Sequence, residues 1–250
     1  MNLALRKKTE EPLAHNTRNV CIGLISALFL QVTERPLTKY LFKIKTGILP
    51  LFKLSSLLER VFAVLLLDYT FYLWHRLNHR NRFLWRFHSV HHTDQDLTLS
   101  TGMRFHVGEL FFSLFWRSAQ ILILGIRPGT LKLWQTLTLL EIFFHHANLR
   151  LPLRLEKILH LFIVTPRMHG IHHSIKMDET NSNYSSLLSI WDRLHGTLHS
   201  KLSDPELIIG CPHGMKRSLS LREFYLLPVK NLNGTQGSQN QSGILHPSPS

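Results

Sequence analysis

Eight histidines of this chain stand in three short motifs whose spacing suits metal binding. They form one HxxxH motif and two HxxHH motifs: His75 and His79; His88, His91 and His92; and His169, His172 and His173. Residues at positions i, i+3 and i+4 of a helix share one face, so each motif can aim two or three imidazoles at the same point. Imidazole binds iron, zinc, copper and nickel, and this many imidazoles exceeds the need of one tetrahedral zinc. The spacing therefore predicts a histidine-rich metal site.

Two further histidines stand where they could join this set. His106 directly precedes an apolar stretch, and His146 ends another. With both, the candidate set reaches ten residues, enough for two metals with four or five ligands each. Two metals about 3.5–4 Å apart can bridge and activate an oxygen ligand. His145 stays ambiguous, because on a helix it points about 100° away from its neighbour His146.

Neutral imidazoles leave the charge of a metal uncompensated, so carboxylates are expected to orient them. The candidates are Asp68, Asp94, Asp96, Glu109, Glu141 and Asp192. Five other histidines lack such a context, and we interpret them as structural or surface residues: His15, His160, His199, His213 and His246.

Apolar helices are expected to position these motifs. The stretch Val61–Trp74 runs straight into His75, so one helix should carry the first motif at its polar end. The stretches Val107–Ile126 and Thr130–Ala147 predict two more helices, separated by a turn at Pro128. Thr165-Pro166 reads as a helix N-cap followed by proline at the first helical position, which would start the helix of the last motif.

The apolar stretches leave the mode of membrane association open. Val20–Val32 is shorter than the roughly 20 residues of a full span, and Glu34, Arg35 and Pro36 are expected to end it. Charged residues interrupt the later apolar stretches, and such residues usually face a bundle interior or a polar site. The pattern fits full spans, and it equally fits short re-entrant or interfacial helices.

Composition limits the remaining classes. A chain of 250 residues can form one large domain, and a net charge of +13 suits nucleic acid or an anionic membrane. No Lys/Arg stripe alternates with aromatic residues, which argues against nucleic acid as a partner. Cys21 and Cys211 lack CxxC spacing, which argues against a thiolate metal site. Residues 1–19 are interpreted as a basic, flexible lead and residues 231–250 as a disordered tail.

Taken together, the motifs resemble the sterol desaturase / fatty acid hydroxylase superfamily of integral-membrane, non-heme di-iron enzymes. The resemblance runs through Trp74-His75-Arg76 with His79, Leu84 to His92, Asp96-Leu97-Thr98, Arg104-Phe105-His106, His146-Ala147-Asn148, Pro166 to Ser174, and Asn183-Tyr184 with Leu188 to Leu194. It covers roughly residues 68–197. The chain departs from the pattern at His195, where an aromatic residue is usual, and at Val107, where a proline is usual.

This resemblance implies an all-α fold: a helical membrane anchor with a helical histidine-box di-metal domain on the cytosolic side, here residues 20–230. Arginines crowd the histidines, which also favours the cytosolic side. The implied ligands of two irons are His75, His79, His88, His91, His92, His169, His172 and His173, followed by His106 and His146. The implied co-substrate is O2, the substrate is a membrane lipid, and the electrons come from a separate reductase, cytochrome or ferredoxin.

Our hypothesis from the sequence is therefore an integral-membrane enzyme that hydroxylates or desaturates a C–H bond of a lipid. Two alternatives remain: a histidine-rich membrane protein that binds or transports metal without redox chemistry, and a catalytically inactive remnant of the hydroxylase fold. The sequence leaves open the lipid substrate, the choice between hydroxylation and desaturation, and the oligomeric state.

Overall fold

The computed structural model describes residues 4–200, 207–212 and 219–234, and this part of the chain is built from helices joined by loops. Its helices are α1 (Pro12–Leu41), α2 (Ser56–Arg80), α3 (Arg82–His92), α4 (Val107–Leu124), α5 (Pro128–His146), α6 (Leu153–Leu159), α7 (Pro166–His172), α8 (Met177–Thr180), α9 (Ile190–Leu194) and α10 (Leu221–Gly234), with short 3-10 helices η1 (Leu49–Phe52) and η2 (Leu99–Met103). Extended structure among the described residues is limited to two isolated bridges. The predicted all-α class is confirmed.

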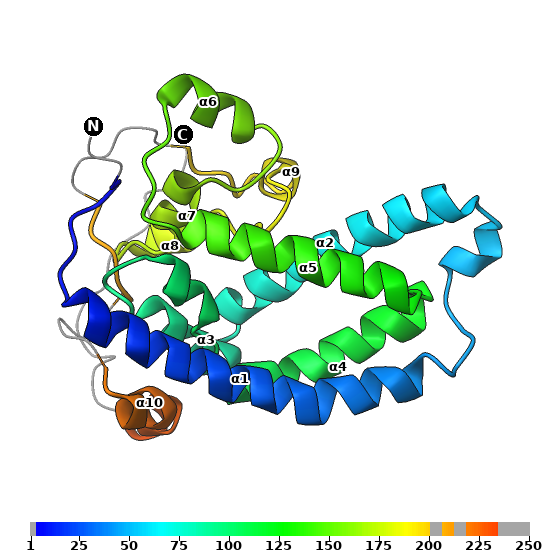
Figure 1. Ribbon diagram of the computed structural model, residues 1–250, viewed down its shortest axis with the longest axis horizontal. Helices are drawn as coiled ribbons and strands as arrows, with labels where there is room; N and C mark the ends of the chain where they lie inside the picture. The colour runs from blue at the N-terminus through cyan, green and yellow to red at the C-terminus, as the bar shows by residue number, and fades with distance from the viewer. Residues whose placement is uncertain (1–3, 201–206, 213–218, 235–250) are drawn as a thin grey trace, which may run out of the picture.

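Four long helices form the body of the molecule. In Figure 1, α1, α2, α4 and α5 run lengthwise, and α3 and α7 lie at one end of the bundle. Helix α1 packs on α4, α2 packs on α5, and α7 packs on the end of α5. The helices that carry the histidine motifs therefore meet at this end.

The helical hairpin expected from the apolar pattern is present. Helix α4 ends at Gly125, which adopts a left-handed conformation (φ 73°) that favours glycine, and α5 begins with Pro128 in its first turn. Around this turn lies a hydrophobic core that includes Leu67, Ile121 and Trp134. The core fixes the far end of the bundle, opposite the histidines.

Helix α1 is longer than the apolar run that predicts it. The stretch was expected to end at Glu34, Arg35 and Pro36, yet the helix continues through Pro36 to Leu41. Leu37 and Leu41 pack against the hydrophobic core, and this packing offsets the hydrogen bond that proline removes. Glu34 lies 3.8 Å from Arg117 of α4 and accepts a hydrogen bond from Gln135 of α5, so its charge faces the bundle.

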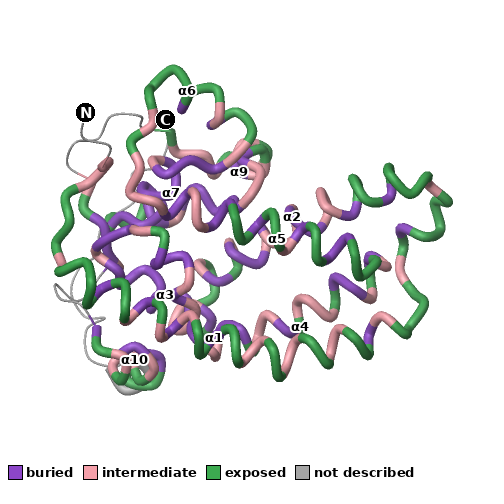
Figure 2. The backbone as a smooth tube through the Cα atoms, viewed as in Figure 1, coloured by how far each residue is buried: buried purple, intermediate pink, exposed green. Residues whose placement is uncertain are grey.

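The outer faces of the long helices are apolar. Helices α1 and α4 are long and apolar enough to cross a membrane. Leu24 and Leu28 of α1 are each 65% exposed, and Phe115 of α4 is 63% exposed. Figure 2 shows exposed and half-buried positions along α1, whereas buried residues gather around α3 and α7. Large apolar surfaces of this kind fit a lipid environment.

Parts of the two terminal segments predicted to be flexible lie within the described residues. Where the structure describes the predicted flexible lead, residues 4–19 make specific contacts. The backbone N–H groups of Thr9 and Glu10 donate to the carboxylate of Asp96, and Arg6 exchanges hydrogen bonds with Asn148. Acceptors far along the chain thus order a segment that has no apolar pattern of its own. Of the predicted tail 231–250, residues 231–234 belong to α10, and residues 235–250 lie outside the described residues.

Candidate metal centre

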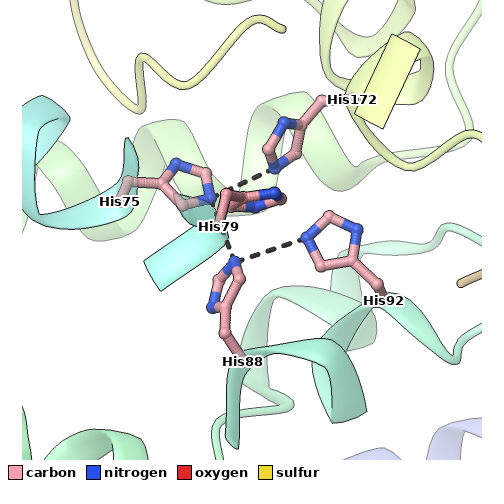
Figure 3. Close-up of side chains that lie close together, drawn as sticks. All are labelled: His75, His79, His88, His92 and His172. Atoms are coloured by element: carbon pink, nitrogen blue, oxygen red, sulfur yellow. Dashed lines mark hydrogen bonds between the residues drawn. The ribbon is translucent and has the colours of Figure 1, made fainter. Parts of the chain in front are cut away.

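The helix ends bring nine of the ten predicted ligands into two adjoining groups. The five-histidine group, drawn in Figure 3, contains His75 and His79 of α2, His88 and His92 of α3, and His172 of α7. The four-histidine group contains His91 of α3, His146 of α5, and His169 and His173 of α7 and its C-cap. In each group, one nitrogen from every ring lies within 4.8 Å of all the others.

Each HxxHH motif is divided between the two groups. In α3, His88 and His92 enter the five-histidine group and His91 enters the four-histidine group. At α7 the division is reversed, because His169 and His173 enter the four-histidine group and His172 enters the other. In each motif, the residues at positions i and i+4 thus belong to one histidine group, and the residue at position i+3 belongs to the other group. Each HxxHH motif therefore directs two of its imidazoles to one group, within the expected two or three, and its third imidazole to the other group.

Hydrogen bonds outside the five-histidine group fix the tautomers of three of its rings. The Nδ1–H group of His75 donates to the carbonyl oxygen of Tyr184 at 2.6 Å, and that of His172 donates to the carbonyl oxygen of Ser182 at 2.7 Å. A carbonyl oxygen cannot donate, so in both rings the proton lies on Nδ1. The Nδ1 of His88 lies 3.0 Å from Oε1 of Glu109, which places its proton there as well. In a neutral ring, Nε2 then carries a lone pair.

These lone pairs face one another at close range. The Nε2 atom of His75 lies 3.1 Å from Nε2 of His172 and 3.1 Å from Nε2 of His88. None of the three atoms has a proton to share, so the contacts are repulsive unless a cation lies between them. Metal–nitrogen bonds of 2.0–2.1 Å in a tetrahedral site separate the nitrogens by about 3.3–3.4 Å, close to the observed spacing. The donor set therefore fits a metal ion.

Burial disfavours protonation of several of these histidines. Desolvation lowers the pKa of His172 to about 3, and it lowers the pKa values of His91, His92, His169 and His173 well below the ordinary 6.5. The neutral form is the one that binds a metal.

The four-histidine group repeats this arrangement. The Nδ1–H group of His146 donates to the carbonyl oxygen of Ile142 at 2.7 Å, and its Nε2 lies 3.1 Å from Nε2 of His91 and 3.0 Å from Nε2 of His169. The Nε2 atoms of His169 and His173 are 3.0 Å apart. The rings of His92 and His173 stack with centroids 4.2 Å apart, so the two groups adjoin.

Two other histidines occupy different positions. The structure places His106 in neither group. It is the N-cap of α4, where its Nδ1 accepts from the N–H of Gly108 at 2.9 Å and its Nε2–H donates to the carbonyl oxygen of Tyr225 at 3.3 Å. His145 is buried beside the four-histidine group, with its ring centroid 4.0 Å from that of His169.

The carboxylates proposed as partners divide into distinct roles. Glu109 contacts a histidine of the five-histidine group directly, through His88. Asp192 accepts from the backbone N–H groups of Tyr184 and Ser185, each at 2.9 Å, and thereby holds the loop whose carbonyl oxygen orients His75. Asp68 accepts from the indole N–H of Trp191 at 2.6 Å. Asp68 and Asp192 thus support the fold around the site.

Asp94 belongs to a buried polar network that spacing alone could not reveal. It accepts from His15 at 2.8 Å and from Thr101 at 2.8 Å, and it lies 3.7 Å from the guanidinium of Arg104. Burial alone would raise the pKa of Asp94, but Arg104 and His15 lower it below its usual range. His15, interpreted as structural, lies 79 positions away in the sequence. The backbone carbonyls that orient the ligands were also missed, since every residue carries one.

Comparison with known proteins identifies relatives of this chain. The family model described as fatty acid hydroxylase matches residues 60–197. The ornithine lipid hydroxylase OlsE of Rhizobium tropici is 33% identical over 141 residues, which cover 56% of this chain and 41% of that protein. The alkylglycerol monooxygenase of Homo sapiens is 30% identical over 151 residues, or 60% of this chain and 32% of that protein.

A third relative, the cholesterol 25-hydroxylase of Homo sapiens, is 27% identical over 143 residues, or 56% of this chain and 51% of that protein. The matched part of the chain thus spans about a third to a half of the length of these curated relatives. No solved structure matches the chain. The family match covers more than half of the chain and includes every histidine of both groups, so the chain belongs to the fatty acid hydroxylase family.

Proposed function

We propose that this chain catalyses the O2-dependent hydroxylation of a lipid C–H bond at a centre of two non-heme irons. The observation that carries the proposal is the set of Nε2 lone pairs held 3.1 Å apart in a buried site. The names of the relatives, which are lipid hydroxylases or monooxygenases, support the reaction class. The five-histidine and four-histidine groups would each hold one iron.

The substrate explains why a metal is needed. An alkyl C–H bond offers neither an acidic proton nor a leaving group, so acid–base side chains cannot attack it. The two irons would supply the oxidising power once O2 and electrons are delivered. In the balanced reaction, one O2, two electrons and two protons convert the C–H bond to C–OH and release one water. A separate reductase, cytochrome or ferredoxin would provide the electrons.

The chain's own residues position and shield this chemistry. The carbonyl oxygens of Tyr184, Ser182 and Ile142 hold the imidazoles so that Nε2 faces inward. His92, His172 and His173 are fully buried, which excludes bulk water from the centre. Apolar outer faces on α1 and α4 suit a bilayer, from which a lipid could reach the site without crossing water. We place the centre on the cytosolic side, consistent with the arginines around it.

Metal content and oxygen labelling test the proposal together. The full chain, expressed with iron and purified in detergent, should contain about two irons, as expected for two groups of four or five ligands. With a chemical reductant and ¹⁸O2, extracted membrane lipids should gain one labelled oxygen. His91→Ala and His172→Ala should each lose iron and labelling together. His106→Ala is the matched control and should keep both, because His106 lies in neither group.

Each failure has a distinct meaning. Labelled lipid from His91→Ala or His172→Ala at the normal level would refute the proposed site. Stable metal binding without labelled lipid would favour a metal-binding or transport protein. Folded chain that takes up negligible metal would favour an inactive remnant of the fold.

A further inference from the structure

An apolar groove lies outside the two histidine groups, between α2 and α9. One face of α2 lines it with Phe62, Leu65, Leu66 and Tyr69, and Trp191 and Leu194 of α9 form the opposite wall. Its volume is about 230 Å³. An enclosed apolar cavity of about 150 Å³ binds benzene, so this groove, which is open on one side, has room for a short hydrocarbon segment.

Hydrogen bonds within the protein engage the Trp191 indole, the Tyr69 hydroxyl and one ring nitrogen of His195 at the groove. The indole N–H of Trp191 donates to Asp68, and the ring nitrogen Nε2 of His195 lies 3.2 Å from the hydroxyl oxygen of Tyr69. The His195 ring also stacks on Tyr72, with centroids 5.0 Å apart. The lining includes neither a carboxylate nor a Lys or Arg side chain. The walls therefore offer carbon surface to an occupant and fit a hydrocarbon segment better than a charged headgroup.

The rim of the groove is continuous with apolar surface. Phe62 is 46% exposed, Leu194 is 67% exposed and the neighbouring Ile190 is 44% exposed. Farther along α2, Leu57 and Leu58 are exposed as well. Such side chains are unfavourable in water and match the interior of a bilayer. The occupant that this surface admits is a chain of a membrane lipid.

An aromatic layer connects the inner end of the groove to the metal centre. The ring of Tyr72 contacts that of His195 on one side and that of Tyr184 on the other, with centroids 5.0 and 6.3 Å apart. The ring of Tyr184 in turn lies 5.2 Å from that of His79 and 5.8 Å from that of His172. Two successive aromatic rings, those of Tyr72 and Tyr184, thus lie between His195 at the groove and the five-histidine group.

We propose that the groove between α2 and α9 binds a hydrocarbon chain of a membrane lipid. In the proposed hydroxylase, the groove holds the segment of the lipid substrate's chain that lies far from the reacting carbon. This assignment to the substrate rests on the proposed function. Leu65, Leu194 and His195 then determine which chains fit.

Photolabelling in a bilayer tests the groove without requiring turnover. The iron-loaded full chain is placed in phosphatidylcholine nanodiscs that contain a trace of phosphatidylcholine with a diazirine in one acyl chain. After illumination, adducts are mapped by mass spectrometry. We expect adducts on Leu65, Leu66 and Trp191 at a higher yield than on Leu24 and Leu28 of α1, which are exposed outside the groove.

A matched pair of variants on α2 separates groove binding from surface labelling. Leu65→Trp narrows the groove, whereas Leu58→Trp adds the same side chain at a position that is 48% exposed and outside it. Labelling of Trp191 should fall about tenfold in Leu65→Trp, as expected when roughly two buried methylenes are displaced, and should persist in Leu58→Trp.

The outcomes distinguish this inference from the proposed function. Labelling of the groove no higher than that of α1 in the wild-type chain would overturn the inference, whether or not either variant folds. Unchanged Trp191 labelling in a folded Leu65→Trp variant would overturn it too. Groove labelling in a chain that yields no ¹⁸O-labelled lipid would support lipid-chain binding and refute the hydroxylase. Labelled lipid product without groove labelling would leave the hydroxylase in place.

Discussion

Glu109 provides a direct test of how the chain would tune the proposed metal centre. Its Oε1 atom lies 3.0 Å from Nδ1 of His88, and its side chain is only 6% exposed. Its second oxygen, Oε2, is buried with no hydrogen-bond partner among the described residues. The charge of this carboxylate is therefore directed mainly at His88 and, through that ring, at the five-histidine group.

Glu109→Gln removes the charge and keeps an oxygen that can accept from His88. A carboxylate partner raises the basicity of a ligating imidazole, and changing such a partner typically weakens metal binding about 10–100-fold. At about 1.4 kcal/mol for each factor of ten, the expected loss is about 1.4–2.8 kcal/mol. The loss should fall on one metal of the two, because Glu109 contacts the five-histidine group and not the four-histidine group.

Chelator titration of the detergent-purified protein measures this loss. The iron-loaded wild-type chain, with two metals bound as proposed, should release both over a narrow range of chelator concentration, whereas Glu109→Gln should release one metal earlier and retain the other. Glu34→Gln is the matched control, because Glu34 is a half-buried carboxylate of another apolar helix and pairs with Arg117 instead of a histidine. Equal weakening of both metals, or none, would refute the reasoning.

Three further predictions follow from contacts around the site. Asp94→Asn should lower the free energy of unfolding by about 3–5 kcal/mol, because it leaves the buried Arg104 without its countercharge. Chemical denaturation measures this free energy, and a decrease below about 1 kcal/mol would contradict the prediction. Gly170→Ala should destabilise the protein by about 1–3 kcal/mol, because the new Cβ would meet the Arg6 guanidinium. In the control Gly129→Ala, the new Cβ meets nothing within 4 Å, so this variant should be tolerated. Equal melting temperatures of the two variants would contradict the prediction. Burial lowers the pKa of His172 from 6.5 to about 3, so below pH 6.5 the unfolded chain takes up a proton that the folded chain excludes. The free energy of unfolding of metal-free protein should therefore fall as the pH drops from about 6.5 towards about 3, and His172→Gln should flatten this fall; an unchanged slope would contradict the assignment.

Local signals in the sequence predicted the elements well. Thr165 caps α7 as expected, accepting from the N–H of Met168, and Pro166 follows at the first helical position. The first motif lies at the end of α2, and the turn at Pro128 separates α4 from α5. These features depend on the conformational preferences of a few consecutive residues, which can be read directly from the sequence.

Features that depend on distant contacts could not be predicted in the same way. His106 stands before an apolar helix, where a ligand and an N-cap look alike in sequence, and the structure places it at the N-cap. Residues 4–11 have no periodic pattern, and Asp96 orders them from a distant loop. The division of each HxxHH motif between two groups could be predicted only with the knowledge that α3 and α7 meet. The three histidines of one motif spread over a wide sector of the helix surface, so they can point to two neighbouring sites.

The convergence of helix ends completes the electrostatic argument for cations at this centre. Imidazoles are neutral, and Glu109 is the carboxylate that contacts a ligand, so these side chains offset little of the charge of two divalent ions. Helices α2, α3, α5 and α7 all carry group histidines in their last turn. The C-terminus of a helix carries about half a negative charge, so four such ends contribute roughly two negative charges around the histidines. The backbone itself would therefore stabilise cations bound here, and only while these four helix ends stay together, so the proposed metal binding would depend on the packing of the whole bundle end.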